Sequence, residues 1–247
     1  PVPTSNERDA APYLCAGAFV VRDTETGRTQ MAVRRIQVLG GNRLYILVSG
    51  ASPHLLGELR RCAERGKALE CAVVLGYDAP FLLASQIGSG KYGLDKYEVD
   101  STLRGEPLEL VRCRSIDLEV PAWSEIVLEG RIEPGRAEPE GPFAELMGYY
   151  STVAPAPVME VTAVTHRNEP IFQHAFPCRE EHLAYGMIKE AEIFAALSHT
   201  VNVQDVNLTL GGGCRLHAVV SIKKRADGDG KSAILGVLGA YKDIKHV

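Results

Sequence analysis

The chain has 247 residues, of which 45% are hydrophobic and 23% are charged, and a chain of this length can bury a core without disulfides or structural metal. Its formal net charge of −4 and its pI of about 6.0 lack the basic excess by which proteins bind nucleic acid or an anionic membrane surface. No apolar run approaches the roughly 18 residues of a membrane span. The first residues lack a signal-peptide pattern, and the cysteines form no C-x-x-C pair. We therefore expect a cytoplasmic protein with reduced thiols.

The first part of the chain, from residue 13 to about residue 164, is predicted to be mostly strands with one helix. Turn residues at 23–27 and at 40–42 separate apolar segments of strand length, which predicts antiparallel hairpins. The helix is expected over residues 54–65, where apolar side chains recur at helical spacing and Gly66 follows. The expected strands are residues 13–22, 30–38, 43–48, 69–75, 108–113, 124–129 and 159–166. Strands at this spacing favour a barrel.

Two further stretches of this part are predicted to be loops. Residues 88–94 are rich in glycine, and residues 134–142 contain three prolines and two glycines. Gly130 is expected to end the strand that precedes the second of these loops.

The pattern changes after Pro177. A helix is expected over residues 180–200, strands over 205–210 and 214–223, and a second helix over 231–242. The predicted organisation is therefore a β-barrel domain over residues 1–175, a linker helix over 176–200, and part of an α/β domain over 201–247.

Two carboxylates, Glu140 and Glu145, flank the segment Gly-Pro-Phe-Ala. Five residues apart, they would point to opposite faces of a regular strand, but the Gly-Pro step breaks a strand and can turn both toward one site. Closely spaced acids split their pKa values, which leaves one of them protonated near neutrality as a proton donor. From the pattern alone, a surface loop with two solvated acids is the commoner arrangement.

A resemblance to a known family changes that weighting. The segments 120–130 (VPAWSEIVLEG), 140–145 (EGPFAE) and 162–167 (TAVTHR), with Pro170-Ile171, resemble the UbiD family of decarboxylases. Further matches in the family's order are Asp9-Ala-Ala-Pro-Tyr13, Thr26-Gly27, Arg35, Leu103-Arg-Gly-Glu-Pro107 and Asp117-Leu118. The resemblance covers nearly the whole chain.

The resemblance implies a fold and a chemistry. The fold is mostly β plus α, with a split β-barrel of the flavin-reductase-like kind followed by part of an α/β domain. The chemistry is removal of CO2, often reversibly, from an aromatic or α,β-unsaturated carboxylic acid with prenylated FMN as cofactor. Arg35 matches the family's active-site arginine, Glu140 the acid that pairs with it, and Glu145 the acid that delivers a proton to the carbon that loses CO2.

The sequence departs from the family where a divalent metal, Mn²⁺ or Mg²⁺, holds the cofactor phosphate. The resemblance places Gln30 and His54 at the Asn and His ligand positions, and Lys96 at the Glu position. An ammonium cannot coordinate a cation, so the sequence argues against the metal. Three alternatives stay open: the Lys96 ammonium replaces the metal as counter-charge to the phosphate, Asp95 or Glu98 takes over as ligand, or Lys96 is an exposed lysine in an unused site.

The leading hypothesis is a carboxy-lyase that acts on a small carboxylic acid, as a homo-oligomer or as a subunit of a larger complex. Two alternatives are a non-catalytic companion subunit of a multi-subunit UbiD-like enzyme and a plain flavin-binding split-barrel module. The sequence does not identify the acid.

Overall fold

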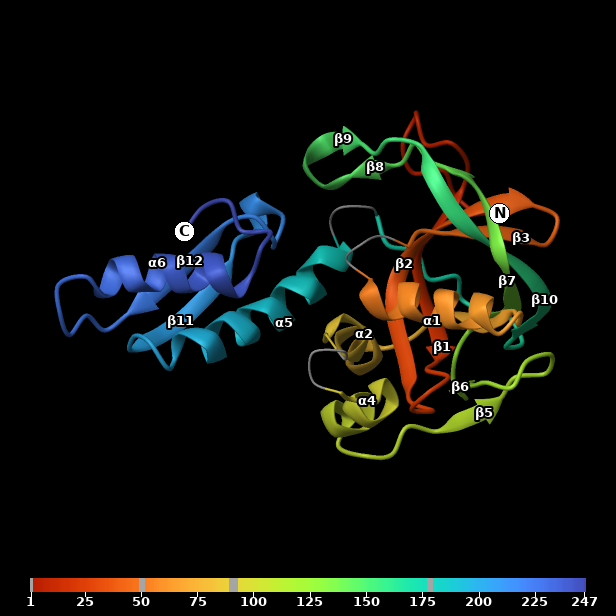
Figure 1. Ribbon diagram of the computed structural model, residues 1–247, viewed down its shortest axis with the longest axis horizontal. Helices are drawn as coiled ribbons and strands as arrows, with labels where there is room; N and C mark the ends of the chain where they lie inside the picture. The colour runs from red at the N-terminus through yellow and green to blue at the C-terminus, as the bar shows by residue number, and fades with distance from the viewer. Residues whose placement is uncertain (1, 49–51, 89–92, 177–179) are drawn as a thin grey trace. The chain divides into compact units, whose positions relative to one another are not determined.

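The computed structural model describes residues 2–48, 52–88, 93–176 and 180–247, which separate into two compact units, Pro1–Phe176 and Pro177–Val247. The first unit is built on a closed barrel of antiparallel strands in the order β1-β2-β3-β10-β7-β4, which confirms the predicted fold class (Figure 1). The barrel strands are β1 (Tyr13–Arg22), β2 (Thr29–Gly40), β3 (Arg43–Ile46), β4 (Leu69–Leu75), β7 (Ile126–Glu140) and β10 (Ala154–His166).

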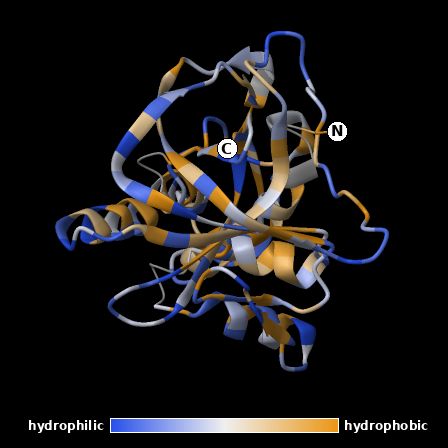
Figure 2. Cartoon of the chain, turned by 90° about the vertical axis from the view of Figure 1, so that its right-hand side faces the viewer, coloured by the Kyte–Doolittle hydropathy of each residue, from blue (hydrophilic) through white to orange (hydrophobic). Residues whose placement is uncertain are grey.

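Strands β1 and β4 are almost entirely apolar because both of their faces are covered. Phe19 and Val73 belong to a core cluster that also includes Leu55 and Cys62 of helix α1 (Pro53–Glu64). Neighbouring residues of the same strands, such as Val20, belong to a second cluster with helices α2 (Ala79–Gln86) and α4 (Lys96–Arg104). Figure 2 shows hydrophobic residues along the central strands and hydrophilic residues on several of the outer loops.

The prediction of a single helix in this unit was wrong, because α2 and α4 are also present. Helix α2 is almost entirely apolar, so it shows no helical alternation of polar and apolar residues. The residue that indicates the start of this helix is its N-cap, Asp78, whose side chain accepts a hydrogen bond from Phe81 N. Helix α4 has only nine residues, and Asp95 caps it in the same way. Of the loop predicted over 88–94, residues 89–92 lie outside the described part of the chain.

The loop predicted over residues 134–142 was also wrong for most of its length. Strand β7 continues through Gly130 and pairs with β10 as far as Glu140. Beyond Ile132, β7 no longer pairs with β4, so its prolines lie on an edge where no N–H is needed. Gly130 marks close contact with β10, since a Cβ there would lie 2.3 Å from the Glu160 carbonyl oxygen. The glycine therefore allows close packing of two strands and does not end one.

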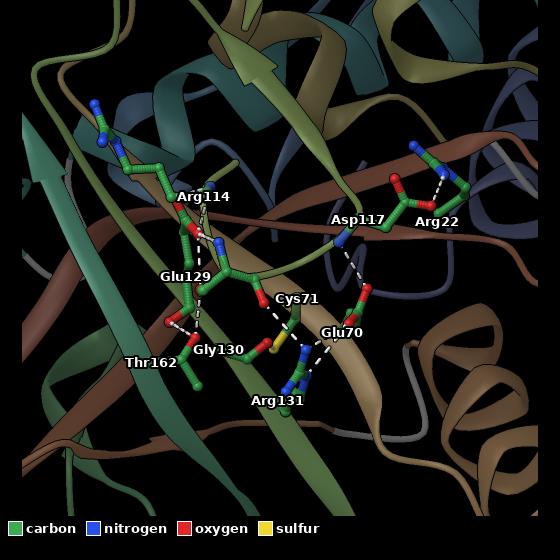
Figure 3. Close-up of polar contacts among 10 residues, drawn as sticks. Arg22, Glu70, Cys71, Arg114, Asp117, Glu129, Gly130, Arg131 and Thr162 are labelled. Carbon is green, nitrogen blue, oxygen red and sulfur yellow. Dashed lines mark hydrogen bonds and ion pairs between the residues drawn. The ribbon is translucent and has the colours of Figure 1, made fainter. Parts of the chain in front are cut away.

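A buried carboxylate anchors the segment between β5 (Leu110–Arg112) and β6 (Glu119–Pro121) to the barrel. Glu129 on β7 is 1% exposed, and it accepts hydrogen bonds from Arg114 N, Ser115 N and the Ser115 hydroxyl (Figure 3). The same figure shows the more exposed Glu70, which accepts from Asp117 N and pairs with Arg131.

Replacing Glu129 by Gln should lower the free energy of unfolding by about 2–3 kcal/mol. The amide has nearly the same size, but in either orientation its NH2 group faces the Arg114 N–H donor, and the charge that strengthens these hydrogen bonds is gone. Chemical denaturation measures the loss. The control is Glu70→Gln, which breaks a partly exposed pair and should cost about 1 kcal/mol or less. Equal losses in the two variants would contradict the anchoring role of Glu129.

In the second unit, two helices pack on a two-stranded antiparallel sheet. Its elements are α5 (Glu180–Leu197), β11 (Val203–Leu208), a 3₁₀ turn (Leu210–Gly212), β12 (Ala218–Ile222) and α6 (Asp229–Ala240). Ile193 and Leu197 of α5 lie in one core with Val206 of β11 and Val237 of α6. The helix that we expected as a linker is thus packed into this unit. Among the described residues, no helix is both long and apolar enough to cross a membrane.

Candidate active site

The structure brings Arg35, Glu140 and Glu145 together. The Arg35 guanidinium forms a bidentate pair with Glu140, with Nε 2.9 Å from Oε1 and Nη2 2.6 Å from Oε2. Its remaining nitrogen, Nη1, donates to Oε1 of Glu145. One guanidinium therefore holds two carboxylates that lie five residues apart in the sequence.

A kink after β7 makes this arrangement possible. Strand β7 ends at Glu140, Gly141 follows with a φ of +91° that favours glycine, and the Gly141–Pro142 peptide is cis. The chain then enters the short strand β8 (Ala144–Glu145), which pairs with β9 (Tyr149–Tyr150) (Figure 1). The break in the strand was predicted from the Gly-Pro step.

Side chains from other segments hold the kink in place. Gln37 Oε1 accepts from Gly141 N at 3.0 Å, and Asp9 Oδ1 accepts from Ala144 N at 2.9 Å. The Phe143 ring lies below the Arg35 guanidinium, with 5.0 Å between Cζ and the ring centroid. Side chains from β2 and from the N-terminal segment therefore contact both flanks of the kink.

The buried partner of Glu140 is Tyr13, which the sequence analysis did not select as a site residue. Glu140 is 0% exposed, and the Tyr13 hydroxyl lies 3.1 Å from Glu140 Oε1 and 3.1 Å from Gln37 Oε1. Burial, and then the negative charge of Glu140, raise the pKa of the Tyr13 phenol, so it remains a hydrogen-bond donor. The role of Tyr13 follows from strand register, which places it opposite Gln37 in the β1–β2 pair and which the sequence does not display.

Replacing Tyr13 by Phe should destabilise the protein by about 2 kcal/mol, because the buried Glu140 carboxylate loses a hydrogen bond. Urea denaturation at neutral pH measures the change. The matched control is Tyr45→Phe, which removes a hydroxyl that donates at 2.5 Å to Glu138, a carboxylate with a 32% exposed side chain. Water can replace that hydroxyl, so we expect a smaller loss. A Tyr13→Phe effect no larger than the control would show that Glu140 does not depend on Tyr13.

The two glutamates differ in their access to water. The side chain of Glu140 is 0% exposed, whereas that of Glu145 is 45% exposed. A carboxyl group that moves a proton in each reaction cycle must exchange it with solvent, and a fixed counter-charge need not. Of the two carboxyl groups, only that of Glu145 is therefore in direct reach of solvent.

A second arginine, Arg34, lies next to the site in sequence and on the other face of β2. Its Nη1 donates to the Ser52 hydroxyl, and within the described residues its buried Nε has no hydrogen-bond partner. Burial lowers the pKa of the Arg34 guanidinium to about 10. A half-buried guanidinium with an available N–H is a place where an anionic group of a ligand can bind. The residue was missed because its neighbour Arg35 carried the family resemblance.

None of the three residues at the positions of the family's metal ligands is a carboxylate. Lys96 is 2% exposed, so the alternative of an exposed lysine was wrong. His54 is exposed in the first turn of α1, while Gln30 lies near the start of β2. Asp95 is occupied as the N-cap of α4 and also accepts from Thr29 N at 2.6 Å. Among the described residues, no group of three His, Cys, Asp or Glu side chains could hold a metal ion.

Comparison with known proteins gives consistent matches over the whole chain. A family model described as the 3-octaprenyl-4-hydroxybenzoate carboxy-lyase Rift-related domain matches residues 1–180, and the model of the C-terminal domain of the same enzymes matches residues 182–247. The anhydromevalonate phosphate decarboxylase of Methanothermobacter thermautotrophicus is 40% identical over 249 residues, which cover 100% of this chain and 58% of that protein.

Two solved structures are similar throughout. An evolved dimeric form of the UbiD-class enzyme HmfF from Pelotomaculum thermopropionicum, in complex with prFMN, superposes with a TM-score of 0.95 at 42% identity, over 100% of this chain and 57% of that one. The apo 3,4-dihydroxybenzoic acid decarboxylase AroY of Klebsiella pneumoniae superposes with a TM-score of 0.90 at 28% identity. The match covers 99% of this chain and 54% of that one. This chain therefore spans a little over half the length of the relatives that it matches.

Proposed function

The chain belongs to the UbiD family of carboxy-lyases, and from this premise we propose that it forms the cofactor-binding and proton-transfer part of a decarboxylase that depends on prenylated FMN. The observation that carries the proposal is the Arg35 guanidinium held between a buried and a half-exposed glutamate. The proposal is also supported by a similar UbiD-class enzyme, HmfF, whose structure was solved in complex with prFMN.

The residues present suit such a cofactor but not a divalent metal. When bound, prenylated FMN supplies an electron acceptor for the carbon that loses CO2. Arg34, whose buried Nε has no hydrogen-bond partner in the described part of the chain, would face an anionic group of the cofactor. Lys96 stands where a metal would need a carboxylate, so no step is assigned to a metal.

The protein side chains have separable roles in the reaction. Arg35 pairs with carboxylates, so it can orient the carboxylate of the substrate as well as both glutamates. Glu140 is buried and held by Arg35 and Tyr13, and it keeps the guanidinium in place. Glu145 is exposed enough to take a proton from water and to deliver it to the carbon from which CO2 has left.

Two of these relatives suggest the substrate class. They act on anhydromevalonate phosphate and on 3,4-dihydroxybenzoic acid. We propose that this protein acts on an acid of the α,β-unsaturated or aromatic type, and anhydromevalonate phosphate is the first to test because the relatives that act on it reach 40% identity.

The test is to express the chain together with a flavin prenyltransferase, record its absorbance, and measure CO2 release from these acids. Bound modified flavin with CO2 release supports the proposal. A colourless protein that yields no flavin after denaturation would favour a non-catalytic companion subunit. Unmodified FMN without CO2 release would favour a plain flavin-binding module. Light scattering of the same sample gives the oligomeric state, for which we propose self-association or assembly into a larger complex.

A further inference from the structure

Lys96 is a buried lysine whose ammonium group is surrounded by backbone carbonyl oxygens. It is the first residue of α4 and is 2% exposed. Since lysine is almost never buried without partners, its surroundings need an explanation. Its Nζ lies 2.8 Å from Ala84 O and 3.3 Å from Ser85 O, and it also donates to Ile87 O. These three carbonyls belong to the last turn and the C-cap of α2.

The carbonyls at this place attract a cation for two reasons. The last carbonyls of a helix have no partner within the helix, and they lie at the negative end of its dipole. Three acceptors also require three donors, and only the charged form of a lysine amine has three protons. The ammonium is therefore held as a cation by neutral oxygens.

Neutral carbonyl oxygens around one positive charge are the surroundings that potassium ions take in proteins. A divalent cation prefers carboxylate ligands, and the position that would supply a carboxylate here is occupied by Lys96. The lysine ammonium carries the same single positive charge as a potassium ion, and it is attached to the chain.

We propose that the Lys96 ammonium is a built-in replacement for a bound monovalent cation, and that the carbonyl oxygens of Ala84, Ser85 and Ile87 form the site. Helix α4 carries this cation to the end of α2, and Asp95 fixes the start of α4 to Thr29 of β2, the strand that bears Arg35. The native protein then needs no added ion to join α2, α4 and β2. A variant without the ammonium should bind potassium in its place.

The experiment compares thermal unfolding of the native chain and of Lys96→Ala in potassium, sodium and choline chloride at equal ionic strength. In sodium or choline, Lys96→Ala should unfold about 5–10 °C below the native chain. Potassium should restore a large part of that shift and leave the native midpoint unchanged. If Lys96→Ala is unfolded in sodium, refolding is followed as potassium is added, and refolding in potassium alone supports the proposal.

Two variants serve as matched controls. Lys96→Met removes the charge but fills the space, so potassium should not restore it. Lys189→Ala removes a lysine that pairs with the Glu192 carboxylate, and no potassium-specific effect is expected there. A potassium effect that is equal in all variants, or absent from Lys96→Ala in both unfolding and refolding, would overturn the proposal. No flavin is needed for these measurements, so they can fail or succeed independently of the proposed function.

Discussion

Replacing Glu145 by Gln is expected to lower CO2 release by a factor of about 10²–10⁴, the range that general acid catalysis supplies. The amide has nearly the same size and still faces Arg35 Nη1 through an oxygen, but it has no acidic proton to give to the carbon. The half-exposed position of Glu145 also means that the change should cost little stability. Turnover of the flavin-loaded protein is the first measurement, and the flavin content of the purified variant is the second.

The control for this prediction is Glu138→Gln. Like Glu145, Glu138 is a partly exposed glutamate with an arginine partner, but it lies on β7 and pairs with Arg43 and Arg136 instead of Arg35. Its replacement should leave CO2 release within about twofold of native. Full activity in Glu145→Gln would remove Glu145 from the proton-transfer step, and loss of flavin from that variant alone would show that it binds the cofactor instead.

The barrel and the site triad were accessible from the sequence for different reasons. Strand β4 was predicted at its observed bounds, Leu69–Leu75, because both of its faces are buried and its residues are almost all apolar. The Gly-Pro break indicated that Glu140 and Glu145 could face one site, since a regular strand would have separated them. The pattern alone still favoured two solvated acids, and only the family resemblance named Arg35, more than 100 positions away, as their partner.

The elements that were missed depend on contacts which the sequence does not display. Helix α2 is apolar on all sides because it packs against the barrel, so it has no periodic pattern to detect. The second half of β7 contains prolines because one of its edges is free, a fact of sheet order and not of composition. Tyr13 and Lys96 take their roles from partners in other elements, Glu140 and the end of α2, so only the structure reveals them.

Replacing Arg35 by Met should both abolish CO2 release and lower the free energy of unfolding by about 3–5 kcal/mol. The large stability effect follows from Glu140, which is 0% exposed and would become a buried carboxylate without its cation. The reference is Arg136→Met, which breaks partly exposed pairs with Glu160 and Glu138 and should lower the free energy of unfolding much less. Chemical denaturation measures both.

The double variant Arg35→Met, Glu140→Gln separates the two consequences of losing the guanidinium. Because the amide carries no charge, burying it beside Tyr13 costs less than burying an unpaired carboxylate, so the double variant should be more stable than Arg35→Met alone. CO2 release should stay abolished, since neither the substrate carboxylate nor Glu145 has a cation to orient it. If stability did not recover, the cost of Arg35→Met would come from lost packing on Phe143 and not from the charge of Glu140. If activity recovered with it, the guanidinium would serve only to neutralise Glu140 and would have no part in holding the substrate.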